Sequence, residues 1–379
     1  MLKRPLVLVG LAALLAGARA ELKPEQPTVA TLPSPTPYRL YLSDMVISHF
    51  VDGKLMLIDG DSMALQGQVA LGMAGQATLS PDRSEILVST AYFSKLNRGE
   101  RIAELDVYDA TTLKLKAEIN VPAKHAQAMP YRGAVRTSAD GRWVFLQNAT
   151  PATSVTVVDR AAGKFAAEVA TPGCWMIYPP ASASNRFSTL CGDGTLLTVT
   201  LDDNGQPVDR KKSRKFFDAD DDALFVSAAQ DGDTYTFVSF KGRVQPVDLS
   251  GTEAQPGEAW SLLSAADSAA GWRPGGYQPL ALHAASGRLY VGMHPRGKEG
   301  SHKEPAREIW AFDLARKARV ARLPGEKATV IAASQGQAPK VFGLATENGM
   351  VAVYDAGAKP RFVRRAGPFS EFGTQIDTH

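Results

Sequence analysis

Leu55-Met-Leu-Ile-Asp59 is a short apolar run that ends at an acidic residue, and a polar turn and another apolar run follow it. The same pattern occurs seven times in all, and the other instances are Leu105–Asp109, Val155–Asp159, Leu197–Asp202, Val244–Asp248, Ile309–Asp313 and Val351–Asp355. The final aspartates are 50, 50, 43, 46, 65 and 42 positions apart. Repeats of this length are typical of propellers, in which each blade is a four-stranded sheet that needs neighbours to bury its faces. The sequence therefore predicts an all-β protein, a seven-bladed β-propeller.

The recurrence of the aspartate at the same position of each repeat has a local explanation. Its carboxylate can accept hydrogen bonds from turn amides two residues later and so begin a hairpin. A second pattern, such as Ser80-Pro-Asp or Ser138-Ala-Asp-Gly before a β-branched or aromatic run, predicts a further hairpin in the same blade. We expect these aspartates to form turns and to have no catalytic role.

The two ends of the repeat array predict how the ring closes. Tyr38 to Ile47 is typical of a second strand and Leu55 to Asp59 of a third, so the first blade lacks a first strand. Residues Glu371 to His379 remain after the last repeat. We expect this tail to supply the missing strand, because closure removes open sheet edges. Residues 38–379 are then one propeller domain.

The N-terminal segment predicts export. Residues 1–20 combine Lys3 and Arg4 with an apolar stretch and the ending Ala18-Arg-Ala20, which is the pattern of a cleavable signal peptide. The apolar run is too short to span a bilayer. Residues 21–37 are proline-rich and predict an extended arm. Removing the signal takes the formal net charge from +3 to zero, which argues against nucleic acid or a membrane surface as the partner.

Two cysteines, Cys174 and Cys191, remain in the predicted mature chain. Export to an oxidising compartment such as the periplasm favours their pairing in one disulfide. The spacing is unlike the Cys-x-x-Cys motif of redox-active pairs. We therefore expect a structural disulfide.

The remaining motifs give little support to chemistry on this chain. The six histidines include His294 and His302 in one basic loop, but their spacing matches no established metal site, so we expect no metal. The chain has no Gly-x-Ser-x-Gly elbow, phosphate-binding loop or dinucleotide fingerprint. A metal-dependent lactonase, another propeller function, would need carboxylates at the central channel, and the acidic run at residues 218–222 is more typical of a solvated turn.

The longest gap between repeats, from Asp248 to Asp313, is the first candidate for a partner surface, because inserted loops on a rigid scaffold often carry recognition. It contains Trp272 and Tyr277, and the loop with His294 and His302. Tryptophans in a propeller usually pack between blades, and the alternative for Trp272 and Tyr277 is that they present aromatic surface to a partner.

Several blocks of sequence resemble the heavy subunits of the quinone-cofactor amine dehydrogenases. They are Tyr92 to Asp109, Gln147 to Ser154, Thr171-Pro-Gly-Cys-Trp-Met-Ile-Tyr-Pro179, Leu190-Cys-Gly-Asp-Gly194, Trp260-Ser-Leu-Leu, Trp272-Arg-Pro-Gly-Gly-Tyr277 and His294 to Lys303. The resemblance covers nearly the whole mature chain, and the blocks follow the family's order. The Gly-Cys-Trp, Cys-Gly-Asp-Gly and Gly-Lys-Glu-Gly blocks are similar to aromatic amine dehydrogenase rather than to methylamine dehydrogenase, which remains the alternative.

The resemblance implies a non-catalytic heavy subunit with Cys174 bridged to Cys191. Its partner would be a small light subunit that carries tryptophan tryptophylquinone and the catalytic base, in an α2β2 heterotetramer. A primary aromatic amine would be oxidised to aldehyde and ammonia, and electrons would pass to a blue copper protein such as azurin. Catalytic and cofactor-binding residues are then expected on the light subunit and none on this chain.

His49-Phe50 resembles a His-Phe pair that places an aromatic ring at the substrate-channel entrance in methylamine dehydrogenase heavy subunits. The resemblance thus implies that Phe50, next to His49, lines the channel, and the alternative is a Phe that packs within a blade. A function of a different class also stays open, namely a free-standing periplasmic propeller that binds a protein or small ligand without chemistry.

Overall fold

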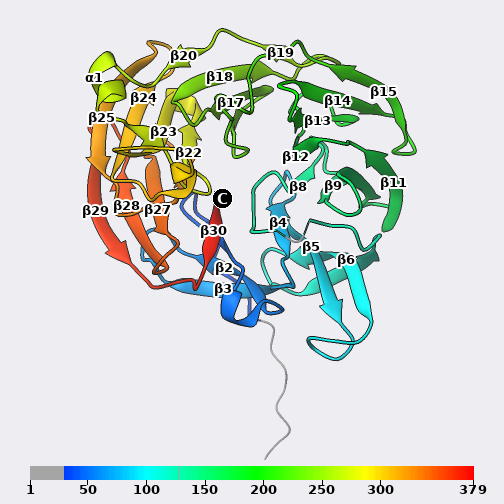
Figure 1. The fold of residues 1–379 in the computed structure, drawn as a ribbon. Coiled ribbons are helices and arrows are strands. Elements are labelled where there is room, and N and C mark those ends of the chain that lie inside the picture. Colours follow the sequence, from blue (N-terminus) through cyan, green and yellow to red (C-terminus); the bar gives the residue numbers. More distant parts are fainter. Residues whose placement is uncertain (1–29, 127) are drawn as a thin grey trace, which may run out of the picture. The chain divides into compact units, whose positions relative to one another are not determined.

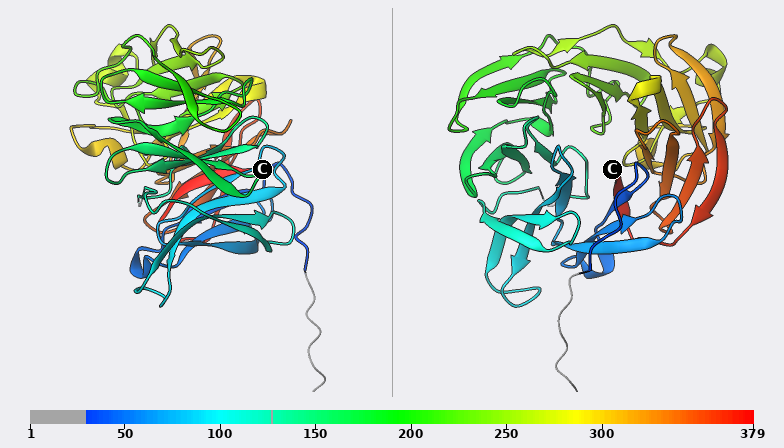
Figure 2. Two further views of the ribbon diagram at one scale, coloured as in Figure 1. Left: turned by 90° about the vertical axis from the view of Figure 1, so that its right-hand side faces the viewer. Right: turned by 180° about the vertical axis from the view of Figure 1, so that it is seen from behind.

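The computed structural model describes residues 30–126 and 128–379, and in it seven β-sheets form a ring, as Figure 1 shows. One blade combines the two ends of the chain, in the order β3 (Leu65–Gly72), β2 (Gly53–Ile58), β1 (Leu40–Asp44) and β30 (Gly373–Thr378). Leu42 lies opposite Ile376 in this antiparallel pairing. The predicted seven-bladed propeller and its closure by the C-terminal strand are confirmed, and Figure 2 shows the closing strand from behind.

The other six blades follow one another along the chain, each built from antiparallel neighbours. The next three contain β4 (Gln76–Leu79), β5 (Glu85–Phe93), β6 (Arg101–Asp109) and β7 (Leu115–Asn120); β8 (Val135–Thr137), β9 (Trp143–Asn148), β10 (Ser154–Asp159) and β11 (Lys164–Ala170); and β12 (Cys174–Tyr178), β13 (Arg186–Cys191), β14 (Leu196–Leu201) and β15 (Pro207–Lys212).

The last three blades hold the irregular strands. They contain β16 (Ala229–Asp231), β17 (Thr234–Val238), β18 (Arg243–Asp248), β19 (Gln255–Pro256) and β20 (Trp260–Ser261); β21 (Arg273–Pro274), β22 (Leu280–His283), β23 (Arg288–His294), β24 (Glu308–Asp313) and β25 (Ala318–Pro324); and β26 (Val330–Ala333), β27 (Lys340–Ala345), β28 (Met350–Asp355) and β29 (Arg361–Ala366). The blade with the long insertion is thus the sixth.

In residues 30–126 and 128–379, helix is confined to one short α-helix, α1 (Ala265–Ala269), and the 3-10 turns η1 (Ile47–His49), η2 (Ala284–Ser286) and η3 (Ser301–Lys303). None of the helices in the described ranges has the length and hydrophobicity to cross a bilayer. The predicted signal peptide, residues 1–20, and most of the predicted arm, residues 21–37, lie outside the described residues.

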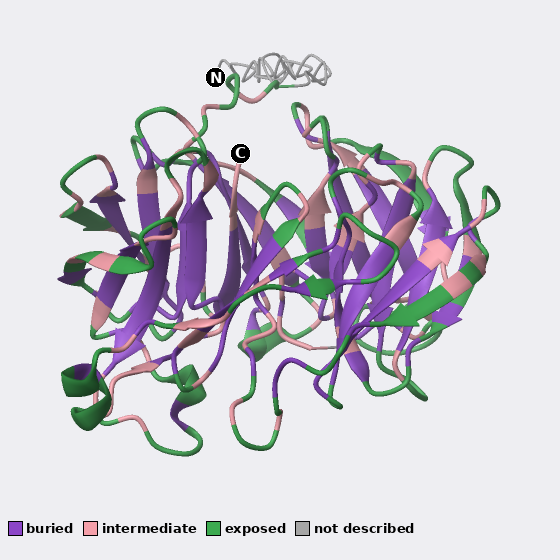
Figure 3. Cartoon of the chain, turned by 90° about the horizontal axis from the view of Figure 1, so that it is seen from above, coloured by how far each residue is buried: buried purple, intermediate pink, exposed green. Residues whose placement is uncertain are grey.

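The core lies between neighbouring blades, where the middle strands are buried on both faces. β10 is buried at all six positions, whereas the outermost strand β7 is exposed at all but Ile119. Trp143 and Trp310 are buried in the clusters between the third and fourth and between the fifth and sixth blades. Figure 3 shows this pattern as buried strands with exposed connections at both edges.

The repeat aspartates form turns, as predicted. In each of the seven repeats the aspartate carboxylate accepts a hydrogen bond from a backbone amide of the turn that follows: Asp59 from Asp61, Asp109 from Thr111, Asp159 from Ala162, Asp202 from Asn204, Asp248 from Ser250, Asp313 from Arg316 and Asp355 from Gly357. Two of the donors lie three residues away instead of two. The aspartate therefore marks the turn between the third and fourth strands of each blade.

The connections gather on two faces, because successive antiparallel strands leave the blade at opposite ends. The loop face carries the connections between second and third strands and between blades, including residues 45–52, 94–100, 121–126, 128–134, 213–228, 262–279, 295–307 and 367–372. The turn face carries the shorter connections at residues 59–64, 80–84, 110–114, 138–142, 160–163, 179–185, 202–206, 249–254, 284–287, 314–317, 334–339 and 356–360. All long insertions therefore lie on the loop face.

Candidate functional site

Phe50 lies on the loop face, in a connection that is firmly anchored. The side chain is 38% exposed, and Ile47 beside it is 49% exposed. Ser48 donates hydrogen bonds from its backbone amide and its hydroxyl to the carboxylate of Glu371. The buried Asp44 carboxylate accepts hydrogen bonds from the amides of Glu371 and two neighbouring positions, Val46 and Phe372. The loop thus holds two apolar side chains out toward solvent in a fixed position.

His49 is exposed and does not take part in a buried network. Its Nδ1 lies 3.0 Å from the hydroxyl oxygen of Ser48. It ends the 3-10 turn η1, whose first residue follows the left-handed Val46. His49 therefore belongs to the same surface as Phe50 but its contacts are local.

The insertion of the sixth blade is held by backbone contacts between its two loops. The amide of Gly276 donates to the carbonyl oxygen of His302 at 2.9 Å, and the amide of Gly297 donates to that of Gly271 at 2.7 Å. Gly297 leaves no room for a larger residue, because a Cβ there would lie 2.0 Å from the Arg273 side chain. Ser264 and Asp267 form a capping box at the start of α1. The insertion is therefore an ordered part of the blade.

Trp272 lies partly within the blade. Its ring centroid is 5.0 Å from that of Trp310, and the guanidinium of Arg322 lies 5.4 Å from its centroid. Arg319 and Arg322 both pair with the buried Asp267 carboxylate. Ser264 and Arg319 donate hydrogen bonds to this carboxylate, and they hold the pKa of Asp267 at about 2 although burial opposes that shift. Trp272 is thus half-buried beneath a charged network.

The other three predicted surface residues lie at different depths. His294 is only 5% exposed, and burial lowers the pKa of its imidazole. Tyr277 is half-buried against Phe372, with ring centroids 5.8 Å apart. His302 is exposed, and its ring stands edge-on to that of Phe240 at 6.4 Å. Of the predicted set, His302 is exposed, Trp272 and Tyr277 are half-buried and His294 is buried, so the four residues do not lie at one depth.

The described residues contain no group of three or more histidine, cysteine or acidic side chains arranged to hold a metal ion. The run at residues 218–222 forms ion pairs at the surface, where Asp218 pairs with Lys215 and Asp221 with Lys241. These acidic side chains lie in the loop-face connection 213–228.

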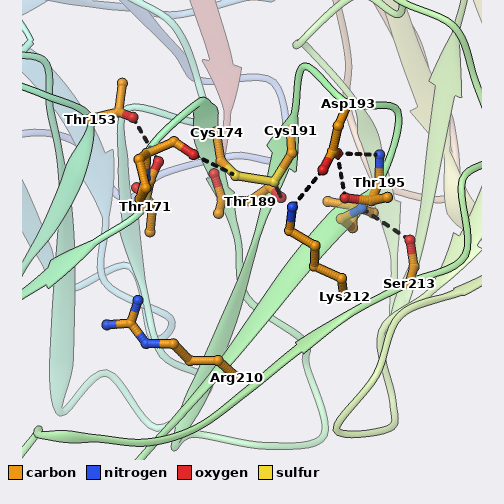
Figure 4. The surroundings of a disulfide bond; sticks show 12 residues. Thr153, Thr171, Cys174, Thr189, Cys191, Asp193, Thr195, Arg210, Lys212 and Ser213 are labelled. Atoms are coloured by element: carbon orange, nitrogen blue, oxygen red, sulfur yellow. Dashed lines mark hydrogen bonds and ion pairs between the residues drawn. A yellow bond between two sulfur atoms is a disulfide. The ribbon is translucent and has the colours of Figure 1, made fainter.

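The disulfide joins Cys174 to Cys191, as predicted, and Figure 4 shows its surroundings. The two cysteines face each other across β12 and β13, with Cα atoms 3.9 Å apart. Next to it Asp193 accepts hydrogen bonds from Thr195 and Lys212, which hold the pKa of its carboxyl below the usual range. The bond thus fixes the fourth blade at its loop-face end.

A buried carboxylate pair on β6 was not foreseen from the sequence. Glu104 and Asp106 lie on one face of the strand, and Asp106 accepts hydrogen bonds from the hydroxyls of Tyr92 and Tyr108. Burial, together with the neighbouring Asp106, raises the pKa of Glu104 to about 7. Burial also raises the pKa of Asp106. The signal was present as polar alternation at positions 104, 106 and 108, which Asp109 and its turn obscured.

Comparison with known proteins identifies the family. The model of the family described as methylamine dehydrogenase heavy chain matches residues 37–369. This chain belongs to the methylamine dehydrogenase heavy chain family. It is therefore a heavy subunit of an amine dehydrogenase, and membership implies a light-subunit partner in a complex.

Curated relatives agree with this assignment. A methylamine dehydrogenase heavy chain from Methylobacillus flagellatus is 28% identical and covers 82% of this chain and 77% of the relative. One from Methylophilus methylotrophus is 25% identical and covers 88% and 81%. Among solved structures, a protein of unknown function from Desulfotomaculum acetoxidans has a TM-score of 0.60 at 12% identity and covers 90% of this chain and 98% of that one. Kuenenia stuttgartiensis hydrazine synthase has a TM-score of 0.54 at 14% identity, covering 88% and 99%. These structures show the propeller fold alone.

Proposed function

We propose that this chain is the non-catalytic heavy subunit of a periplasmic amine dehydrogenase whose light subunit carries tryptophan tryptophylquinone and the catalytic base. The assembly would be an α2β2 heterotetramer that converts a primary amine and water to an aldehyde, ammonia and two protons, and passes the two electrons singly to two molecules of a blue copper protein such as azurin. Family membership and the order of the resembling blocks support this proposal. The signal-peptide pattern of residues 1–20 supports export to the periplasm.

The observation that carries the role of this chain is the anchored loop with Phe50. The quinone, held by the light subunit, supplies the electron-accepting chemistry. This chain would supply a rigid face for docking and one wall of the substrate channel, where Phe50 excludes water and positions the apolar part of the amine. An exposed aromatic held by the hydrogen bonds of Ser48 and Asp44 suits that role, because little conformational freedom is lost when a partner covers it.

Two substrate classes follow from two different observations. The Gly173-Cys-Trp175 and Cys191-Gly-Asp-Gly194 blocks resemble aromatic amine dehydrogenase, so we propose a primary aromatic amine as the substrate. The curated relatives are named methylamine dehydrogenase heavy chains, so methylamine is the second candidate.

The test is to purify the native protein from the periplasm of cells grown on an aromatic amine, and to record its subunit pattern and visible spectrum. The proposal expects a co-purifying small subunit and quinone absorbance that tyramine bleaches. Bleaching by methylamine but not tyramine would assign the second substrate class. A colourless chain without a small subunit would contradict the dehydrogenase proposal and leave a free-standing binding propeller.

A further inference from the structure

The central channel of the propeller contains a cavity on the turn-face side. Two adjoining cavities of about 360 Å³ each share five lining residues, Arg83, Arg136, Gln230, Asp377 and Thr378. Together their linings include residues on or directly after the innermost strand of every blade, namely β30, β4, β8, β12, β16, β22 and β26. Since only the axis of the ring touches all seven blades, this cavity is the open end of the central channel.

The lining is rich in guanidinium groups. Arg83, Arg132 and Arg136 all line the second of these two cavities. Asp377 and Asp231 are the carboxylates among the residues that line it. Arg132 is paired, since its Nε lies 2.7 Å from a carboxylate oxygen of Asp377. Three positive charges thus face two negative ones.

Arg83 and Arg136 have neutral partners among the described residues. Arg83 donates through Nη1 to the backbone carbonyl oxygen of Thr378 at 2.6 Å. Arg136 donates through Nη2 to the side-chain oxygen of Gln230 at 2.6 Å and to the Tyr235 hydroxyl oxygen at 3.3 Å. These contacts fix the guanidinium groups in place and leave further N–H donors of each for a ligand, because arginine has five.

We propose that the turn-face end of the central channel binds a small organic anion that carries a carboxylate or phosphate group. Arg136 and Arg83 are the residues that bind this group. A cavity of this size takes a small metabolite. The planar guanidinium matches both oxyanions with paired hydrogen bonds, and partial exclusion of water strengthens them. Gln230 on β16 holds Arg136 in position by accepting a hydrogen bond from its guanidinium group.

The site is separate from the proposed substrate channel. Phe50 and its loop lie on the loop face, whereas Arg83 and the turn that follows β12 lie on the turn face. The inference therefore stands on the cavity and its charges and does not depend on the amine dehydrogenase chemistry.

The test is titration calorimetry of the purified protein, in the assembly in which it is isolated, with succinate and with inorganic phosphate at constant ionic strength. We expect saturable binding, and a loss of affinity of about tenfold or more in Arg136→Gln and in Arg83→Gln, since each removes charge-assisted hydrogen bonds. Arg316→Gln is the matched control, because it removes one positive charge from the same face while its partner Asp313 lies outside the channel. The control should bind within about twofold of the unmodified protein. The tighter of the two anions identifies the class.

A second measurement uses the unmodified protein and so does not depend on variants that fold. Phenylglyoxal modifies accessible arginines, and mass spectrometry of the peptides reports each site. Succinate or phosphate should protect Arg83 and Arg136 and leave the modification of Arg316 unchanged. Equal modification with and without about 10 mM anion, or equal affinities for Arg136→Gln and Arg316→Gln, would overturn the proposal. Amine oxidation assayed on the same sample is independent, so binding without oxidation contradicts only the proposed function.

Discussion

The loop face and the turn face of this propeller are built from the same strands but by different means. On the turn face, short connections repeat one device, an aspartate that accepts hydrogen bonds from the amides of its own turn. On the loop face, long connections are fixed by individual contacts, such as the pairing of Ser48 with Glu371 and the disulfide of Cys174. Repetition serves stability on one face, and variation on the other leaves room for recognition.

The two regions also differ in how their carboxyl groups titrate. Turn amides and hydroxyls hold the pKa of Asp109 below its usual value and that of Asp82 at about 2. In the half of β6 near the loop face, burial instead raises the pKa of Glu104 to about 7. Lowering the pH therefore weakens the hydrogen bonds of the turn-face aspartates. Raising the pH through 7 instead ionises the buried Glu104 and destabilises its surroundings. Four changes to the protein test how the two faces differ.

The largest expected effect is loss of the covalent tie at the loop face. Replacing both cysteines, Cys174→Ala with Cys191→Ala, should lower the free energy of unfolding by about 3 kcal/mol, because the unfolded chain is no longer constrained by a loop of 17 residues. Urea denaturation followed by circular dichroism measures this. A loss below about 0.5 kcal/mol would show that the loop face does not depend on the bond.

The second substitution removes the pH-sensitive carboxyl. The pKa of Glu104 is raised from 4.5 to about 7, so its contribution to stability is complete below about pH 4.5 and is lost as pH rises through 7. Glu104→Gln stays neutral and should stabilise the protein by about 2 kcal/mol at pH 8, with little effect at pH 4.5. Denaturation across this pH range measures the effect.

The matched control is Glu118→Gln, which changes an exposed carboxyl on β7 of the same blade. Its stability should follow the pH dependence of the unmodified protein. If Glu118→Gln and Glu104→Gln gave the same curve, the buried pair would not be the source of the effect.

The third substitution weakens one turn of the turn face. Asp109→Ala removes hydrogen bonds from the amides of Thr111 and Thr112 and from the Thr112 hydroxyl, and should cost about 1 kcal/mol at pH 7. Because the pKa of Asp109 is lowered, this contribution is present above pH 3.8 and lost as pH falls further, so the difference should shrink in acid. Asp203→Ala, at an exposed position of another turn, should cost almost nothing. Equal costs for the two would show that the repeat aspartate does not stabilise its turn more than an exposed carboxylate of the same face does.

The smallest expected effect on folding comes from Phe50→Ala, since surface substitutions usually change stability by less than about 0.5 kcal/mol. In the assembled enzyme the same change should lower kcat/KM for the amine by about tenfold, through loss of the channel wall. Phe165→Ala is the control, because Phe165 on β11 is 39% exposed and Phe50 is 38% exposed. Equal kcat/KM values for the two variants would show that Phe50 does not line the substrate channel.

The fold could be predicted because its signals are local and repeated. The aspartate of each repeat lies where turn chemistry requires it, and the unmatched tail at Glu371 to His379 indicates how the ring closes. The disulfide could be predicted because the sequence has only two cysteines and because its N-terminal pattern predicts export.

The candidate site was less predictable, because depth and convergence depend on contacts between distant segments. His294 reads as a loop residue, yet it ends β23 and is buried by the insertion around it. Arg83 and Arg136 come from different blades, and nothing in either local sequence shows that both reach the axis of the ring. Burial of Glu104 likewise depends on blade packing.

Closure of the ring by β30 also determines when the first blade can finish folding. Strands β1 and β2 come first in the chain, yet their blade stays incomplete until residues 373–378 join it. Contacts between such distant segments form late and slowly, since a large loop must close before they add stability. Until then the chain exposes an unpaired strand edge at each end. Pairing of its final residues covers these edges and so removes a site at which the chain could aggregate.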